Sequence, residues 1–285
     1  YIIEEVYEDI KADAKILKNK IVPVIKRHDG TKHIAIFYLA YELVEQNTGY
    51  LDSNIILNSL KEYQKLSYLT SEEIDLFMLC LKVALIKFIA RICLNISNSQ
   101  IKKIEVENIL SSDFSDEEVT KKLAKEFKSF RKFKEEVLDT SKIKNTNTAY
   151  VEYMAYRLKE HGQKGEKYFK ILKDEANKIG FTIEEAIVKE HKEIAKTTDY
   201  IGRAICSFKT LNGINFRDIF ERVNKIDETL KDDYTLEFEK CDFKTKTRYR
   251  NYIIKIAKKY NLSEVYVAKK AVECSHKYKK HVGFF

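Results

Sequence analysis

Apolar residues recur at helical spacing along most of the chain. Ile36, Leu39 and Leu43, for example, occupy positions i, i+3 and i+7, which lie on one face of a helix. A single proline, Pro23, and eight glycines leave few positions at which a helix must stop. The pattern predicts an all-α protein of about a dozen helices packed as helical hairpins, without a substantial sheet.

Several helix starts can be located from local polar signals. Capping boxes, in which a hydroxyl and a glutamate satisfy the first amides of a helix, occur at Thr70–Glu73, Ser115–Glu118 and Thr182–Glu185. Asp242 and Ser263 are further N-cap candidates. With the stops given by glycine and polar runs, the predicted helices are 3–18, 32–46, 53–66, 74–96, 115–138, 149–161, 166–179, 182–196, 198–210, 216–230, 244–260 and 263–280.

The polar, aperiodic run 139–148 (DTSKIKNTNT) is the best candidate for a subdomain boundary. It predicts an N-terminal helical subdomain over 1–140, with a long apolar central helix, and a C-terminal helical subdomain over 149–285. A single continuous domain is the alternative. The stretch 95–115 is rich in Asn and Ser, and we expect loops around a short helix there.

The predicted helix 74–96 is apolar on nearly every side. A membrane span is one interpretation, but Asp75, Lys82, Lys87 and Arg91 interrupt the apolar run. They leave fewer than the roughly 20 apolar residues that a span requires. We therefore expect a buried central helix.

The composition describes a strongly charged globular protein, with 44% apolar and 34% charged residues. Five scattered cysteines without CxxC spacing favour free, mostly buried thiols over disulfides or a zinc site. The chain begins at Tyr1 and stops at Phe285 on an apolar pair. We expect both ends to be cut from a longer protein.

The net charge of +8 is concentrated at the C-terminal end. From Lys240 to Phe285 there are thirteen Lys and Arg against three acids, so the rest of the chain is slightly acidic. A cationic segment of this kind attracts phosphate groups of nucleic acids or of anionic lipids.

No arrangement of residues nominates a catalytic, cofactor-binding or metal site. The pairs His28/His33 and His276/His281 are five residues apart, a spacing that turns two helical side chains away from a shared metal. Asp232-Asp233 slightly resembles a nucleotide-sugar metal motif, but an ordinary turn is the better explanation. Phosphate-binding glycine loops and nucleophile elbows are missing from the sequence.

The basic segment 245–260 (TKTRYRNYIIKIAKKY) interleaves cations with tyrosines, as nucleic-acid-binding surfaces do. However, Tyr249, Ile253, Ile256 and Tyr260 share one helical face, which predicts that these tyrosines are buried. A solvated basic face on a core helix is therefore the interpretation that we favour, and we expect no nucleic acid partner.

Three C-terminal segments carry a family resemblance. They read TDYIGRAICSFKTLNGINFRDIFERVNKIDETLKDD (198–233), CDFKTKTRYRNYIIKIAKKYNLSEVYVAKKAVE (241–273) and HVGFF (281–285). They resemble the cyclic β-1,2-glucan synthases, and 39–86 is more loosely similar to a family stretch with a helix pair before a long apolar helix. Phe216 stands where members usually carry tryptophan, and Tyr234 replaces a proline common after the acidic pair.

The resemblance implies a location and a partner. The matching region in these large membrane glycosyltransferases precedes the first membrane helices, and the family's catalytic residues lie elsewhere. It implies a non-catalytic, cytoplasmic accessory or scaffold region, on the inner side of the cell membrane, whose partners are the membrane and glycosyltransferase domains of its own polypeptide.

The resemblance also gives the C-terminal cations a role, because the positive-inside rule places basic residues beside a membrane entry point. We expect Lys277, Lys279 and Lys280 to face anionic lipid head groups, each contributing about 1 kcal/mol of attraction. A carbohydrate- or protein-binding helical module is the alternative function, and a nucleic-acid-binding helical protein is the second.

Overall fold

The computed structural model describes residues 4, 7–8, 10–12, 24–26, 32–110, 146–160, 162–179 and 182–285. The contacts among these residues divide the chain into two compact units. Unit 1 comprises residues 1–86 and 203–285, and unit 2 comprises residues 87–202. The all-α prediction is confirmed, since the strands in the described part of the chain are two three-residue segments.

Unit 1 begins with a small ribbon followed by a helical core. Strands β1 (Val24–Lys26) and β2 (Lys32–Ile34) pair antiparallel, with Ile25 opposite His33. Helices α2 (Ala35–Gln46) and α3 (Ser53–Leu66) follow, and their buried side chains include Ile36, Ala40, Val44, Ile56 and Leu60.

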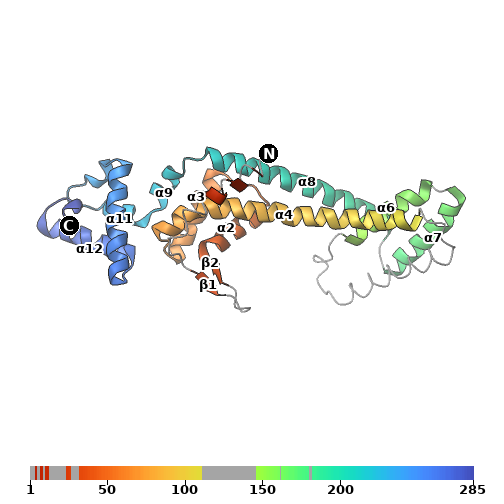
Figure 1. Ribbon diagram of the computed structural model, residues 1–285, viewed down its shortest axis with the longest axis horizontal. Helices are drawn as coiled ribbons and strands as arrows, with labels where there is room; N and C mark the ends of the chain where they lie inside the picture. Colours follow the sequence, from red (N-terminus) through yellow and green to blue (C-terminus); the bar gives the residue numbers. More distant parts are fainter. Residues whose placement is uncertain are drawn as a thin grey trace. The chain divides into compact units, whose positions relative to one another are not determined.

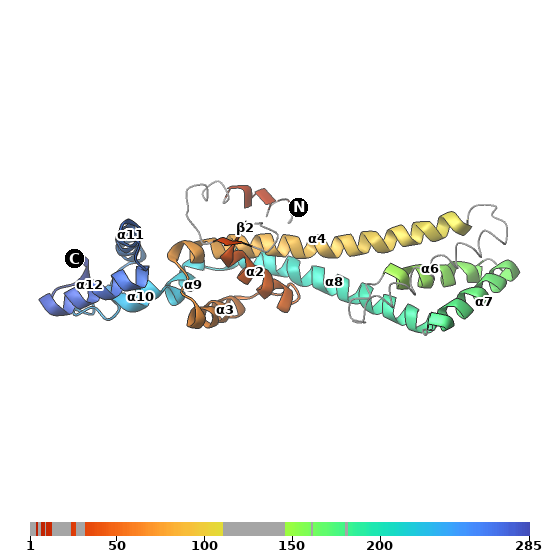
Figure 2. The same cartoon turned by 90° about the horizontal axis from the view of Figure 1, so that it is seen from below.

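The C-terminal half of unit 1 consists of short helices around a second core (Figure 1). These elements are α9 (Phe216–Val223), α10 (Lys225–Leu230), the 3₁₀ helix η3 (Phe238–Lys240), α11 (Phe243–Tyr260), α12 (Glu264–Tyr278) and the 3₁₀ helix η4 (Val282–Phe284). Helix α11 runs across α12 rather than along it in both views (Figures 1 and 2). Ile226, Leu230, Phe238, Ile253 and Val282 form the centre of this core.

Hydrogen bonds join the N-terminal and C-terminal segments of unit 1. Leu51 N donates to Ser207 Oγ at 2.8 Å, and that hydroxyl donates to Gly49 O at 2.7 Å. Gln64 Nε2 donates to Val223 O at 2.7 Å, at the end of α9. Unit 1 is therefore assembled from two segments that are distant in the sequence.

Unit 2 is built from helices α6 (Thr146–Glu160) and α7 (Gly162–Ile179), with the end of α4 (Ser71–Leu110) and the start of α8 (Ile183–Gly213). The hairpin of α6 and α7 is visible in Figure 2. Its core gathers one buried stripe from each helix, namely Val106 and Ile109, Tyr150, Val151, Met154, Ala155 and Leu158, Tyr168, Leu172 and Ala176, and Ile183 and Ala186.

Two helices are longer than the sequence pattern predicted. Helix α4 continues through 95–110, where we expected loops, because polar Asn and Ser residues on an exposed helix lower its stability without breaking it. Helix α8 joins the predicted helices 182–196 and 198–210. At the junction, the Thr198 hydroxyl donates to Ile194 O at 2.9 Å, so the hydroxyl is satisfied inside the helix.

One predicted helix is interrupted instead. The prediction of a single helix over 216–230 was wrong, because Asn224 leaves the helical conformation and separates α9 from α10. Its side-chain oxygen accepts from the amides of Ile226 and Asp227, which makes it the N-cap of α10.

The local capping predictions are confirmed wherever the structure describes them. Thr70 and Glu73 exchange hydrogen bonds of 2.9 and 3.2 Å, and Thr182 and Glu185 do the same at 2.9 and 3.1 Å. Asp242 and Ser263 cap α11 and α12. The predicted capping box at 115–118, the helix to 138 and most of the predicted helix 3–18 lie outside the described residues.

The division into units differs from the predicted subdomains 1–140 and 149–285. Units 1 and 2 share α4 and α8, and unit 1 contains both ends of the sequence. Most of the predicted boundary 139–148 lies outside the described residues. Within the described ranges, no helix carries an apolar stretch long enough to cross a bilayer.

Candidate functional site

The C-terminal end of unit 1 is anchored by one buried carboxylate. Asp233 is fully buried, and its Oδ1 accepts from Ser275 Oγ at 2.6 Å and from Val282 N at 2.8 Å. Burial alone would raise the pKa of Asp233. The hydrogen bonds from Ser275, Thr235 and Val282 outweigh burial and lower that pKa, so the carboxylate stays ionised and ties α12 to η4.

A buried ion pair fixes the position of α11. Arg250 Nε lies 3.0 Å from Asp227 Oδ1 of α10, and both side chains are almost completely buried. The guanidinium also lies 4.8 Å from the ring centroids of both Phe220 and Phe243. Burial raises the pKa of Asp227 to about 6, against the opposing charge of Arg250. This arrangement orients the opposite face of α11 toward solvent.

The exposed face of α11 lies beside the chain end, because Tyr252 and Ile256 of α11 line one pocket with Phe284 and Phe285. We call these two parts together the cationic–aromatic surface. Its members are Arg248, Tyr252, Lys255, Ile256, Lys259, Lys277, Tyr278, Lys279, Lys280, Phe284 and Phe285. Tyr252 and Phe284 are 66% and 68% exposed, so two large aromatic side chains are largely in contact with solvent. Exposed aromatic rings beside cations are the composition found at membrane–water interfaces.

The three lysines predicted from the sequence all lie on this surface. Lys277, Lys279 and Lys280 are exposed, and Lys280 Nζ lies 3.8 Å from the centroid of the Phe284 ring. Lys279 ends α12 with a left-handed backbone (φ 53°). The amide of Lys280 donates to Ser275 O, so the turn that presents these lysines is fixed by the backbone.

The solvated basic face predicted for the helix 244–260 is present on α11, but sequence reasoning did not place this face beside the chain end. Arg248, Lys255 and Lys259 are exposed along one face, and α11 contains no acidic residue. Among the described residues, no carboxylate forms an ion pair with these three cations or with the three lysines at the end of α12. The signal was present in the sequence, because 248, 252, 255 and 259 recur at helical spacing.

The predicted burial of the tyrosine face was wrong. Arg250, Ile253 and Ala257 are the buried residues of α11, whereas Tyr260 is 60% exposed and Ile256 is 39% exposed. The buried face is rotated by about one residue from the prediction, because Asp227 and the two phenylalanine rings draw Arg250 inward. Tyr249 is half-buried, between Phe238 and His281.

The acidic pair and the C-terminal histidines that the sequence analysis considered as metal ligands take part in contacts that hold the fold together. Asp232 is exposed and contributes its carbonyl oxygen, 2.7 Å from His276 Nε2, while Asp233 is the buried anchor. His281 Nε2 lies 3.6 Å from Asp233 Oδ2. In the part of the chain that the structure describes, no three His, Cys, Asp or Glu side chains are grouped to hold a metal.

The cysteines are free, but the expectation that most are buried was wrong. Cys80 is buried, and burial raises the pKa of its thiol to about 12. Cys93 and Cys206 are exposed, and Cys241 and Cys274 are half-buried.

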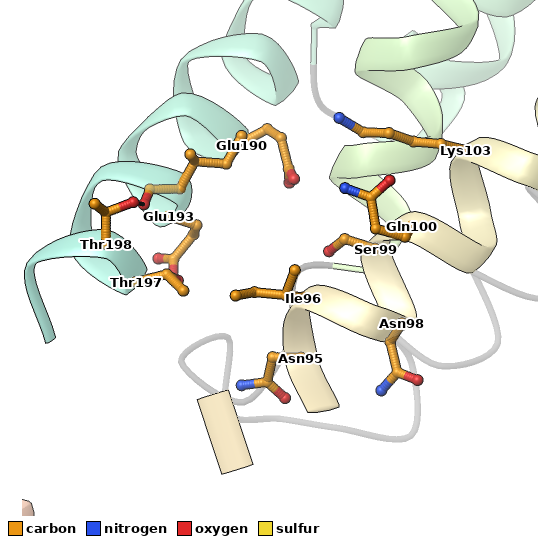
Figure 3. Close-up of a pocket in the computed structure, with 11 residues that line it drawn as sticks. Asn95, Ile96, Asn98, Ser99, Gln100, Lys103, Glu190, Glu193, Thr197 and Thr198 are labelled. Atoms are coloured by element: carbon orange, nitrogen blue, oxygen red, sulfur yellow. Dashed lines mark hydrogen bonds between the residues drawn. The ribbon is translucent and has the colours of Figure 1, made fainter. Parts of the chain in front are cut away.

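A separate pocket of about 240 Å³, lined mostly by residues with polar side chains, lies in unit 2 between α4 and α8. Ser99 and Gln100 of α4 and Glu190 of α8 point into the space between the helices (Figure 3). Glu190 is 97% buried and accepts from Thr148 Oγ1 at 2.8 Å. Burial raises the pKa of Glu190, and the bond from Thr148 opposes that shift. Amides, hydroxyls and carboxylates of this kind bind polar, hydroxyl-rich molecules.

Comparison with known proteins shows a similarity to a curated glucan synthase. The chain is 24% identical over 127 residues to the cyclic beta-(1,2)-glucan synthase NdvB of Rhizobium meliloti (strain 1021). The match covers 45% of this chain and 4% of that protein. No family model matches the chain.

Proposed function

We propose that this chain is a non-catalytic helical accessory region of a membrane-bound, glucan-synthase-like glycosyltransferase, at the cytoplasmic face of the cell membrane. The similarity to a cyclic beta-(1,2)-glucan synthase over 127 residues carries the proposal. The region spans a small fraction of that protein, as expected for an accessory part. Its partners are the membrane and glycosyltransferase domains of the same polypeptide.

The cationic–aromatic surface supports a membrane-facing role within this proposal. Its six cations lie on adjoining elements, and Tyr252, Phe284 and Phe285 project beside them. Cations attract anionic head groups over a Debye length, and aromatic rings insert at head-group depth. The surface therefore supplies both long-range attraction and short-range insertion.

Vesicle co-sedimentation tests the membrane role. The chain is expected to sediment with vesicles that contain anionic phosphatidylglycerol and not with purely zwitterionic vesicles. Replacing Lys277, Lys279 and Lys280 by Glu should lower binding at least tenfold, because the reversal turns three attractions into repulsions. Raising the salt concentration should weaken binding of the unchanged protein.

A matched control reverses the same number of charges elsewhere. Lys170, Lys173 and Lys192 are exposed lysines of unit 2, and replacing them by Glu should lower vesicle binding by less than threefold. Equal losses in the two triple variants would contradict a specific surface. Salt-sensitive binding to duplex DNA without vesicle binding would favour the nucleic-acid-binding alternative instead.

A separate test concerns whether this chain is part of a larger membrane-bound synthase. The gene is expected to encode apolar spans of about 20 residues after the codon for Phe285. The purified chain should transfer no glucose from UDP-glucose. A stop codon directly after Phe285, or clear transferase activity, would contradict the proposal.

The polar pocket of unit 2 supports a second candidate function, binding of a glucan segment. Calorimetric titration with β-1,2-linked gluco-oligosaccharides should show binding that Glu190→Gln weakens at least fivefold, because Glu190 is a buried carboxylate of the pocket and hydrogen bonds to a carboxylate are stronger than those to an amide. Glu193→Gln, at the pocket wall, is the matched variant and should have a smaller effect. Absence of heat at millimolar oligosaccharide would exclude this function.

A further inference from the structure

An apolar cavity of about 350 Å³ opens within the cationic–aromatic surface. Tyr252 and Ile256 of α11, Ala271 of α12, and Phe284 and Phe285 at the chain end line it. The lining contains no charged side chain. Its volume falls within the range of about 300–1,000 Å³ typical of small-molecule sites.

The edge of this cavity is cationic. Arg248, Lys255 and Lys259 flank Tyr252 on the exposed face of α11. Lys280 Nζ lies against the ring of Phe284, which is itself part of the lining. An apolar interior with a cationic edge is complementary to a molecule that has a hydrocarbon tail and an acidic head.

The walls of the cavity are held in place by the buried anchors. Val282 packs into the core beneath η4, and its amide donates to the Asp233 carboxylate. Gly283 also lines the cavity, and a Cβ at this position would approach the Tyr249 hydroxyl to 2.5 Å. The backbone of η4 therefore lies directly against the ring of Tyr249 in α11. This contact places Phe284 and Phe285 at the opening of the cavity.

We infer that this cavity accepts one acyl chain of an anionic phospholipid while the surrounding cations bind its head group. The inference rests on the proposed membrane contact and makes it more specific, since it names the lipid part that enters the protein. Surface adsorption alone would leave the cavity empty and would need only the cations.

Tryptophan fluorescence offers a direct test, because the chain contains no tryptophan. Tyr252→Trp places a single reporter at the cavity, and Tyr50→Trp places one at an exposed position outside it. Phosphatidylglycerol vesicles with acyl chains brominated near the middle should quench the reporter at 252 at least threefold more than the reporter at 50.

Filling the cavity with a larger side chain distinguishes acyl-chain insertion from adsorption at the vesicle surface. Adding Ala271→Phe to the reporter at 252 should remove most of the quenching, because the new ring occupies the cavity. Ala195→Phe, on the exposed face of α8, is the control and should leave the quenching unchanged. Vesicle binding without preferential quenching at 252 would overturn the acyl site and leave the proposed function intact. Absence of vesicle binding would overturn the membrane role.

Lysophosphatidylglycerol below its micelle concentration would then test the cavity alone. Unchanged fluorescence of the reporter at 252 would reject the acyl-chain site.

Discussion

At the residue scale, the buried pair of Asp227 and Arg250 determines which side of α11 meets solvent. Helical periodicity placed Tyr249 and Tyr260 on one face, but it carries no information on which face is buried. The partners of Arg250 come from α9, α10 and the start of α11, so the burial of a charged residue depends on contacts that a local pattern does not contain.

Asp227 should give the protein a pH-dependent stability. The pKa of Asp227 is about 6 in the folded protein and near 3.9 in an unfolded chain. Between about pH 4 and pH 6, the folded state therefore binds a proton that the unfolded state has released. The resulting stabilisation of the folded state is fully present below about pH 4 and is lost as the pH rises through about 6. Chemical denaturation at several pH values should show the unchanged protein losing about 2 kcal/mol relative to Asp227→Asn between pH 4 and pH 7.

Asp232→Asn is the matched control for that measurement, because Asp232 is exposed and contacts His276 through its backbone. Its free energy of unfolding should parallel that of the unchanged protein across the same pH range. A parallel pH dependence for Asp227→Asn would contradict the raised pKa.

At the element scale, helix starts could be predicted from the sequence, but helix lengths could not. A capping box is complete within four residues, so Thr70 and Glu73 act as predicted. The end of α4 depends on whether a polar stretch such as 95–100 is supported by neighbouring packing, as Val106 and Ile109 are in unit 2. That support comes from α6 and α7, which are distant in the sequence.

Asn224, which separates α9 from α10, should have a measurable effect on stability. Its side chain caps α10, and its Nδ2 donates to Ser71 Oγ at 3.1 Å, at the start of α4. Asn224→Ala should lower the free energy of unfolding by about 1–2 kcal/mol, because two amides of α10 lose their acceptor and the Ser71 hydroxyl loses one of its hydrogen bonds. Asn251→Ala, at an exposed position of α11, should change it by less than about 0.5 kcal/mol in the same denaturation experiment. Equal effects would show that the cap has no special role.

At the scale of the whole molecule, the sequence was sufficient for the all-α class and for three lysines of the candidate surface. The basic face of α11 could also be read from helical spacing. The cavity could not be located, because it requires the crossing of α11 and α12 and the attachment of η4 to Asp233. The division into units could not be predicted either. A polar run such as 139–148 indicates a break in the helical pattern, but it does not indicate which segments pack together.

The assembly of unit 1 from two segments bears on how this protein can be dissected. Gln64 binds the end of α9, and Ser71 binds Glu264 of α12, so residues 198–285 complete their fold on α3 and the start of α4. The C-terminal stretch 198–285 is therefore not a separable fragment. Truncated versions that begin near residue 198 would expose Ile219 and Phe220 and aggregate, whereas a design that retains 32–86 and replaces 87–202 by a short linker preserves both sides of the interface.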